Sequence, residues 1–207
     1  MFNIFKSARA AKAAALMLAL ALSATAQADP AKPTRLRGTI VSVQGDVLTA
    51  RAQDGSDLKI ALQPATRVVA IVPASLAGIK QGAFIGVTSM PGDGEERLAL
   101  EVHIFPEALR GTGEGERPWD KGPGSRMTNA TVADVAGVQG QDLTLKFKGG
   151  ETRIKVTPHT KIVSLILSDR HDLKPGNQFI AFALLDAKGL YEPRAINVGR
   201  DGLALPM

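Results

Sequence analysis

The sequence contains no cysteine and few aromatic side chains, with one Trp, one Tyr and seven Phe among 207 residues. Without cysteine, disulfide bonds, thiolate chemistry and cysteine-ligated metals are all excluded, so the hydrophobic core alone must stabilise the fold. Stacking on single-stranded nucleic acid needs exposed aromatic rings beside basic residues. Four Phe instead have the apolar neighbours that are typical of core positions: Phe84, Phe147, Phe179 and Phe182.

Catalytic motifs are also missing from the sequence. It has no Gly-x-Ser-x-Gly elbow, no His-Glu-x-x-His helix and no phosphate-binding glycine loop. We therefore expect a protein that is not an enzyme and holds no cofactor. An enzyme whose site only the fold would reveal is kept as an alternative.

The first 28 residues have the three parts of a secretory signal peptide. Lys6, Arg9 and Lys12 precede an uncharged run of Ala, Leu and Met over 13–22, and Ala26-Gln27-Ala28 is a small-x-small cleavage site. The run is shorter than the roughly 20 residues of a membrane-spanning helix, and no later segment is long and apolar enough. The pattern predicts cleavage after Ala28, a periplasmic location and no integral membrane span.

Removal of that leader changes the charge of the chain. The whole sequence has 25 basic and 20 acidic residues, and three of the basic ones lie in 1–28, so the remainder carries 22 − 20 = +2. A nucleic-acid-binding domain normally keeps a pronounced basic excess, so nucleic acid is not an expected partner. The 207 − 28 = 179 remaining residues suffice for one medium domain or two small ones.

The segment 34–105 resembles the segment 128–199. The matching stretches are 39–43 with 131–135, 48–49 with 143–144, 64–69 with 158–163, and 79–82 with 173–176. Several matches at a nearly constant spacing indicate a tandem duplication.

Each copy has the pattern of about six short strands. Residues 97–105 alternate between apolar and polar side chains, and 66–72 and 160–167 are nearly continuous β-branched runs. We predict an all-β protein with two tandem small OB-like β-barrel modules over 34–105 and 128–199, followed by a tail over 200–207. The segment 106–127, with five Gly and three Pro, is the predicted linker, and its Trp119 is expected to pack on a barrel.

A predicted hairpin in each copy brings basic side chains together. A turn at Gly149-Gly150 would set Lys146 opposite Arg153, and a turn over 54–56 would set Arg51 opposite Lys59. Because like charges directly opposite on a sheet are unfavourable, the repeated arrangement suggests a bound anion, unless a neighbouring carboxylate neutralises it. The candidate anion-binding residues are Lys146, Lys148, Arg153, Lys155, Arg51 and Lys59.

Asp169, His171 and Asp172 lie together in the longer connection of the second copy. Carboxylate and imidazole groups from one loop are the start of a divalent-metal site, so this loop is the candidate metal site of a metal-binding accessory protein. Glu101 and His103 form a second such pair on one face of a strand.

The pattern Gly38-x-Ile40-x-x-Val43, Thr66-x-Val68, Ile79-Lys80-x-Gly82 and the stretch 172–176 resemble a family of secreted bacterial modules of unknown function. Some similar proteins are labelled metal transporter permeases, a label that membrane-spanning segments would have to support. The resemblance implies periplasmic residence and tandem small β-barrels, and it implies no activity. We therefore expect a non-catalytic periplasmic binding or adaptor protein, whose partner is a protein or an anionic envelope component held by the basic hairpin of the second copy.

Overall fold

The computed structural model describes residues 32–136 and 141–205. Within these ranges all regular structure is β-strand or short 3-10 helix, so the predicted all-β class is confirmed. No helix in the described part of the chain is long and apolar enough to cross a membrane. The predicted signal peptide lies outside the described residues.

Strands form where the alternating and β-branched patterns predict them. The first copy supplies β1 (Thr34–Gln44), β2 (Val47–Ala52), β3 (Asp57–Ala61), β4 (Arg67–Pro73), β5 (Phe84–Pro91) and β6 (Arg97–Ile104). The second copy supplies β8 (Arg126–Ala136), β9 (Asp142–Phe147), β10 (Gly150–Lys155), β11 (Lys161–Ser168), β12 (Gln178–Leu185) and β13 (Tyr191–Gly199). A short strand between the copies, β7 (Gly115–Pro118), pairs with β8.

The strands close into two five-stranded circuits, which we call barrel A and barrel B. Barrel A runs β1–β2–β3–β13–β12 and back to β1, and barrel B runs β8–β9–β10–β6–β5 and back to β8. Each circuit contains one parallel pairing between strands of different copies. This pairing is β13 with β3 in barrel A and β6 with β10 in barrel B. The β-barrel fold is thus confirmed.

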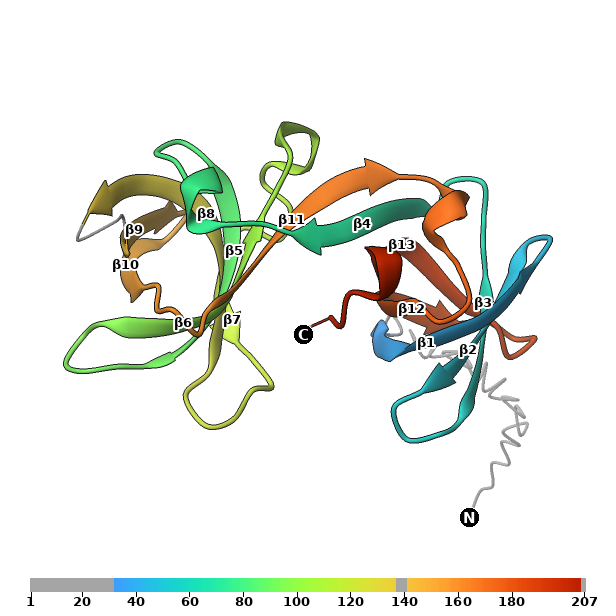
Figure 1. Ribbon diagram of the computed structural model, residues 1–207. Helices are drawn as coiled ribbons and strands as arrows, with labels where there is room; N and C mark the ends of the chain where they lie inside the picture. Colours follow the sequence, from blue (N-terminus) through green and yellow to red (C-terminus); the bar gives the residue numbers. More distant parts are fainter. Residues whose placement is uncertain (1–31, 137–140, 206–207) are drawn as a thin grey trace, which may run out of the picture. The chain divides into compact units, whose positions relative to one another are not determined.

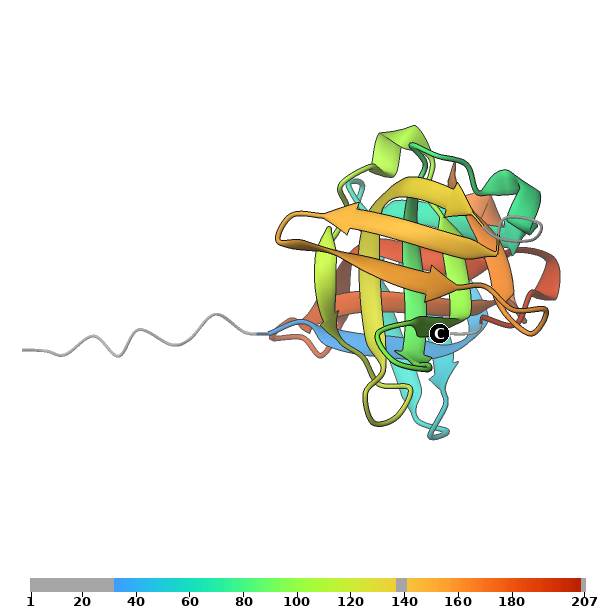
Figure 2. The same cartoon turned by 90° about the vertical axis from the view of Figure 1, so that its left-hand side faces the viewer.

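Each barrel combines strands from both copies, which differs from the expectation that 34–105 and 128–199 each form their own barrel. Barrel A takes its last two strands from the second copy, and barrel B takes its last two from the first. Figure 2 looks at barrel B and shows green strands of the first copy beside yellow and orange strands of the second. Because the copies have similar strand patterns, either pair of closing strands fits either half-barrel locally, and the pattern cannot specify the partner.

In each copy one strand, β4 or β11, connects the three strands in one barrel to the two strands that close the other barrel; we call these two the crossing strands. β4 and β11 pair antiparallel with each other, and each also pairs in parallel with a barrel strand, β13 or β6 (Figure 1). Their register is centred on Ile71 opposite Leu165, and pairs on either side, such as Val69 with Leu167 and Pro73 with Val163, exchange places when the copies are exchanged. The duplication is therefore also an approximate twofold symmetry of the fold.

Each barrel has its own hydrophobic core, filled from both copies. The core of barrel A includes Ile40, Leu48 and Ile60 of the first copy with Phe179 and Ile196 of the second. The core of barrel B likewise joins Ile85, Val87 and Val102 to Val132, Leu143, Leu145 and Ile154. Every one of these side chains is at most 1% exposed, so separating the copies would expose both cores.

The predicted hairpin registers are wrong by two positions, although the apolar residues of both hairpins are buried on one face. Leu143 lies opposite Ile154, and the turn is Lys148-Gly149 rather than Gly149-Gly150. In the first copy Leu48 lies opposite Ile60 instead of Leu62. Side chains alternate between the two faces of a strand, so a slip of two residues leaves the same residues on the core side.

The segment predicted as a linker, 106–127, is packed structure. It contains a 3-10 turn (Glu107–Leu109), strand β7 and the start of β8. Leu109 is buried against Val69 and Leu165 of the crossing strands. Trp119 packs on barrel A, as expected, with the guanidinium carbon of Arg35 at 4.1 Å from its ring centroid.

Candidate functional site on the outer surface of barrel A

The like-charge pairs that suggested an anion site in the hairpins do not form. In the observed register Lys146 lies opposite Glu151 and Arg51 lies opposite Asp57, with N–O distances of 3.6 and 3.1 Å. The other basic candidates also have neutral or acidic neighbours: Arg153 pairs with Thr144, Lys59 pairs with Thr49, Lys155 lies 3.8 Å from Glu96, and the backbone N–H of Lys148 donates to Glu114. The repulsion between like charges, which was the reason to expect an anion at these hairpins, is therefore absent from the observed pairs.

The three predicted metal ligands are not gathered around one point. Asp169 accepts hydrogen bonds from the backbone and the ring of exposed His171. Both contacts lie within the loop. Asp172 is buried and bonded to Ser168 and Arg200, so its carboxylate anchors the C-terminal segment. Hydrogen bonds from Arg200 and Ser168 hold the pKa of Asp172 below its ordinary value, despite burial. No group of three potential ligands lies within metal-binding reach in the described ranges.

Glu101 and His103 on β6 do contact each other. They are hydrogen-bonded and almost fully buried, at 2% and 5% exposed. The two buried side chains satisfy each other's hydrogen-bonding groups, and a substrate has no access to them from solvent.

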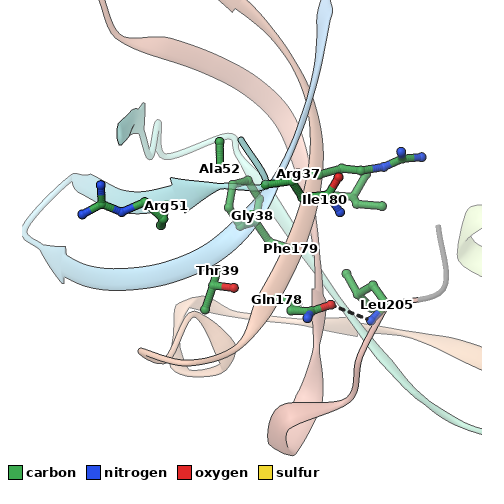
Figure 3. Close-up of a pocket in the computed structure, with 10 residues that line it drawn as sticks. Arg37, Gly38, Thr39, Arg51, Ala52, Gln178, Phe179, Ile180 and Leu205 are labelled. Carbon is green, nitrogen blue, oxygen red and sulfur yellow. Dashed lines mark hydrogen bonds between the residues drawn. The ribbon is translucent and has the colours of Figure 1, made fainter. Parts of the chain in front are cut away.

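A pocket of about 140 Å³ lies on the outer surface of barrel A, where β1, β2 and β12 meet. Thr39 is its central strand residue, since it pairs with Arg51 on one side and Gln178 on the other. Arg37 and Arg51 flank the pocket and extend in opposite directions from it, and Leu205 covers one end by donating its N–H to the Gln178 side chain (Figure 3). The pocket thus offers hydroxyl and amide groups to a small ligand, and the two arginine side chains lead away from it on either side.

Gly38 shapes this pocket through the close approach of β1 and β2. A Cβ atom at this position would lie 2.3 Å from the carbonyl oxygen of Arg51, so only glycine allows the two backbones to approach in this way. The approach brings Arg51 beside the residues of β1 and β12.

Next to the pocket, two arginines of β1 already hold a carboxylate. Arg35 and Arg37 bind Asp120 through N–O contacts of 2.6 and 3.1 Å. Arg35 also stacks on Trp119 and lies 5.4 Å from the ring of Phe182, which is 47% exposed. The Nε of Arg37 is buried and has no acceptor among the described residues. Guanidinium groups in such a setting are strong hydrogen-bond donors to carboxylate and phosphate.

The corresponding place in barrel B is filled. Thr131 takes the position of Thr39, because it pairs with Lys146 and Phe84 in the same registers. The ring of Phe84 packs edge-on against Phe105, and the guanidinium group of Arg110 lies over the Phe84 ring. Arg110 also donates hydrogen bonds to the Thr131 hydroxyl and to the Gly82 carbonyl. Two barrels of the same design therefore differ at this place, one open and polar, the other closed by its own chain.

Sequence reasoning missed Arg35 and Arg37 as site residues. They are 83 to 85 residues from Asp120 along the chain, and an isolated Arg on a strand carries no signal of its own. The one available hint was a Trp-Asp pair inside a Gly- and Pro-rich segment. Comparisons with protein-family models, with curated proteins and with solved structures found no match for this chain.

Proposed function

We propose that this protein is a non-catalytic binding protein that holds an anionic ligand on the outer surface of barrel A. The open pocket flanked by Arg37 and Arg51, at the place that barrel B fills with Phe84 and Arg110, is the observation that carries the proposal. The ligand class is one that presents carboxylate or phosphate groups, because guanidinium groups donate paired hydrogen bonds to both. The periplasmic location belongs to the same proposal and rests on the leader pattern of residues 1–28.

Calorimetric titration of the protein with citrate and with inorganic phosphate tests this proposal. We expect saturable binding of at least one of the two anions. It should weaken as salt rises from about 0.1 M to 1 M, because the screening length falls from ~10 Å to ~3 Å. A preference for one anion identifies whether carboxylate or phosphate is the recognised group.

Arg37→Gln and Arg51→Gln should each weaken this binding several-fold, and Arg153→Gln, which removes the same charge from barrel B, should not. Equal losses in all three variants would mean that the anions respond to net charge alone. Absence of binding by the parent protein and by every variant would overturn the proposed function.

A further inference from the structure

Asp120 reaches barrel A from the tip of the hairpin formed by β7 and β8. Two hydrogen bonds close the base of this tip. The backbone N–H of Trp119 donates to the Ser125 carbonyl at 3.0 Å, and the Ser125 hydroxyl donates to the Trp119 carbonyl at 2.7 Å. Gly122 and Gly124, both with positive φ, complete the turn. The hairpin therefore presents one carboxylate at a fixed position.

The contact of this carboxylate with barrel A has the chemistry of a bound ligand. Asp120 accepts from both Arg35 and Arg37, yet 45% of its side chain remains exposed to solvent. Burial raises the pKa of Asp120, and the hydrogen bonds from the two arginines outweigh it, so the pKa lies below its ordinary value and the group is charged near neutral pH.

Barrel B lacks this arrangement. The positions that correspond to Arg35 and Arg37 are Met127 and Asn129, since they pair with Thr88 and Gly86 as the arginines pair with Phe182 and Ile180. Asn129 donates instead to the carbonyl of Thr112, a neutral contact. The acid held by two arginines is specific to the barrel with the open pocket.

We infer that Asp120 is an internal competitor, which occupies the arginines of barrel A until an external anion displaces it. The inference rests on the proposed function, because Arg37 lines the pocket and also binds Asp120. Tethering gives the internal carboxylate a high effective concentration, so the free anion binds more weakly than it would to unoccupied arginines. A partly exposed ion pair is weak enough for a ligand to break.

The test compares citrate binding by the parent protein, by Asp120→Asn and by Glu151→Gln, which removes one carboxylate from barrel B. We expect Asp120→Asn to bind citrate roughly three- to fivefold more tightly, the gain that follows from removing an exposed ion pair. Glu151→Gln should bind as the parent does. Asp120→Ser serves as a second variant if the melting temperature of Asp120→Asn is lowered.

Trp119 provides an independent readout of displacement, because it is the only Trp of the chain and stacks on Arg35. Citrate should change its fluorescence in the parent protein, with the same midpoint as the calorimetric titration. Equal citrate affinity in Asp120→Asn and the parent, with unchanged Trp119 fluorescence, would overturn the inference while leaving the proposed function in place. No citrate or phosphate binding by any variant would overturn both.

Discussion

Barrels A and B have the same strand order and related sequences, yet the outer surface around Thr39 in barrel A is open and the corresponding surface around Thr131 in barrel B is covered. In barrel B the segment after β6 packs back over the barrel, so that Phe105 and Arg110 cover Phe84. In barrel A the described part of the segment after β13 lies at the edge of the pocket, where the backbone N–H of Leu205 donates to the Gln178 side chain. The difference shows that a duplicated fold can keep one copy of a surface open while the other is used for internal packing.

The largest effect is expected from separating the copies, which would break the composite barrels. Fragments 32–111 and 112–207 each lack the closing strands of their own half-barrel. We expect neither fragment to show a cooperative melting transition as a monomer, and an equimolar mixture to regain one, measured by circular dichroism. Cooperative melting of monomeric 32–111 would show that each copy closes its own barrel.

The next effect concerns Gly38, where barrel A differs from barrel B. Gly38→Ala would place a Cβ atom 2.3 Å from a backbone oxygen, and we expect it to lower the free energy of unfolding by about 2 to 3 kcal/mol. Ala130, which occupies the corresponding position and is fully buried, is the matched control. Ala130→Gly should cost about 1 kcal/mol or less. Equal losses in urea unfolding would contradict a special approach of β1 and β2.

A smaller effect is expected where Asp172 anchors the segment that follows β13. Asp172→Asn removes charge-assisted hydrogen bonds to Arg200 and should cost about 1.5 kcal/mol near neutral pH. The folded-state pKa of Asp172 is lowered, so its contribution is present above the ordinary Asp pKa of about 3.9 and is lost as pH falls through the folded value. The unfolding free energies of parent and variant should therefore converge as pH falls below about 3.9. A constant difference across pH would contradict this assignment.

The smallest effect is expected from the basic hairpin of barrel B. Lys146→Gln with Arg153→Gln removes two exposed charges that lie opposite Glu151 and Thr144. We expect a change of at most about 0.5 kcal/mol in unfolding free energy and unchanged citrate binding. A large loss of citrate affinity in this variant would move the anion site from barrel A to barrel B.

Much of the local structure was predictable. Alternation places Leu48 and Leu143 on buried faces, and these faces are observed. The hairpin registers were not predictable, because a slip of two residues preserves the buried face and only the turn geometry decides between registers. That slip matters for charge: it sets Lys146 beside Glu151 instead of Arg153.

The sequence by itself determined which residues form strands, which faces are apolar and that the chain contains two related copies. These properties follow from side-chain periodicity and local similarity over a few residues. Only the tertiary structure decided which copy closes which barrel and that Arg35 and Arg37 meet Asp120. Both outcomes depend on contacts between distant segments, and strands of similar pattern in the two copies compete for the same places. The choice therefore lies in pairing between distant segments, such as that of β4 with β11, and not in any single stretch of the chain.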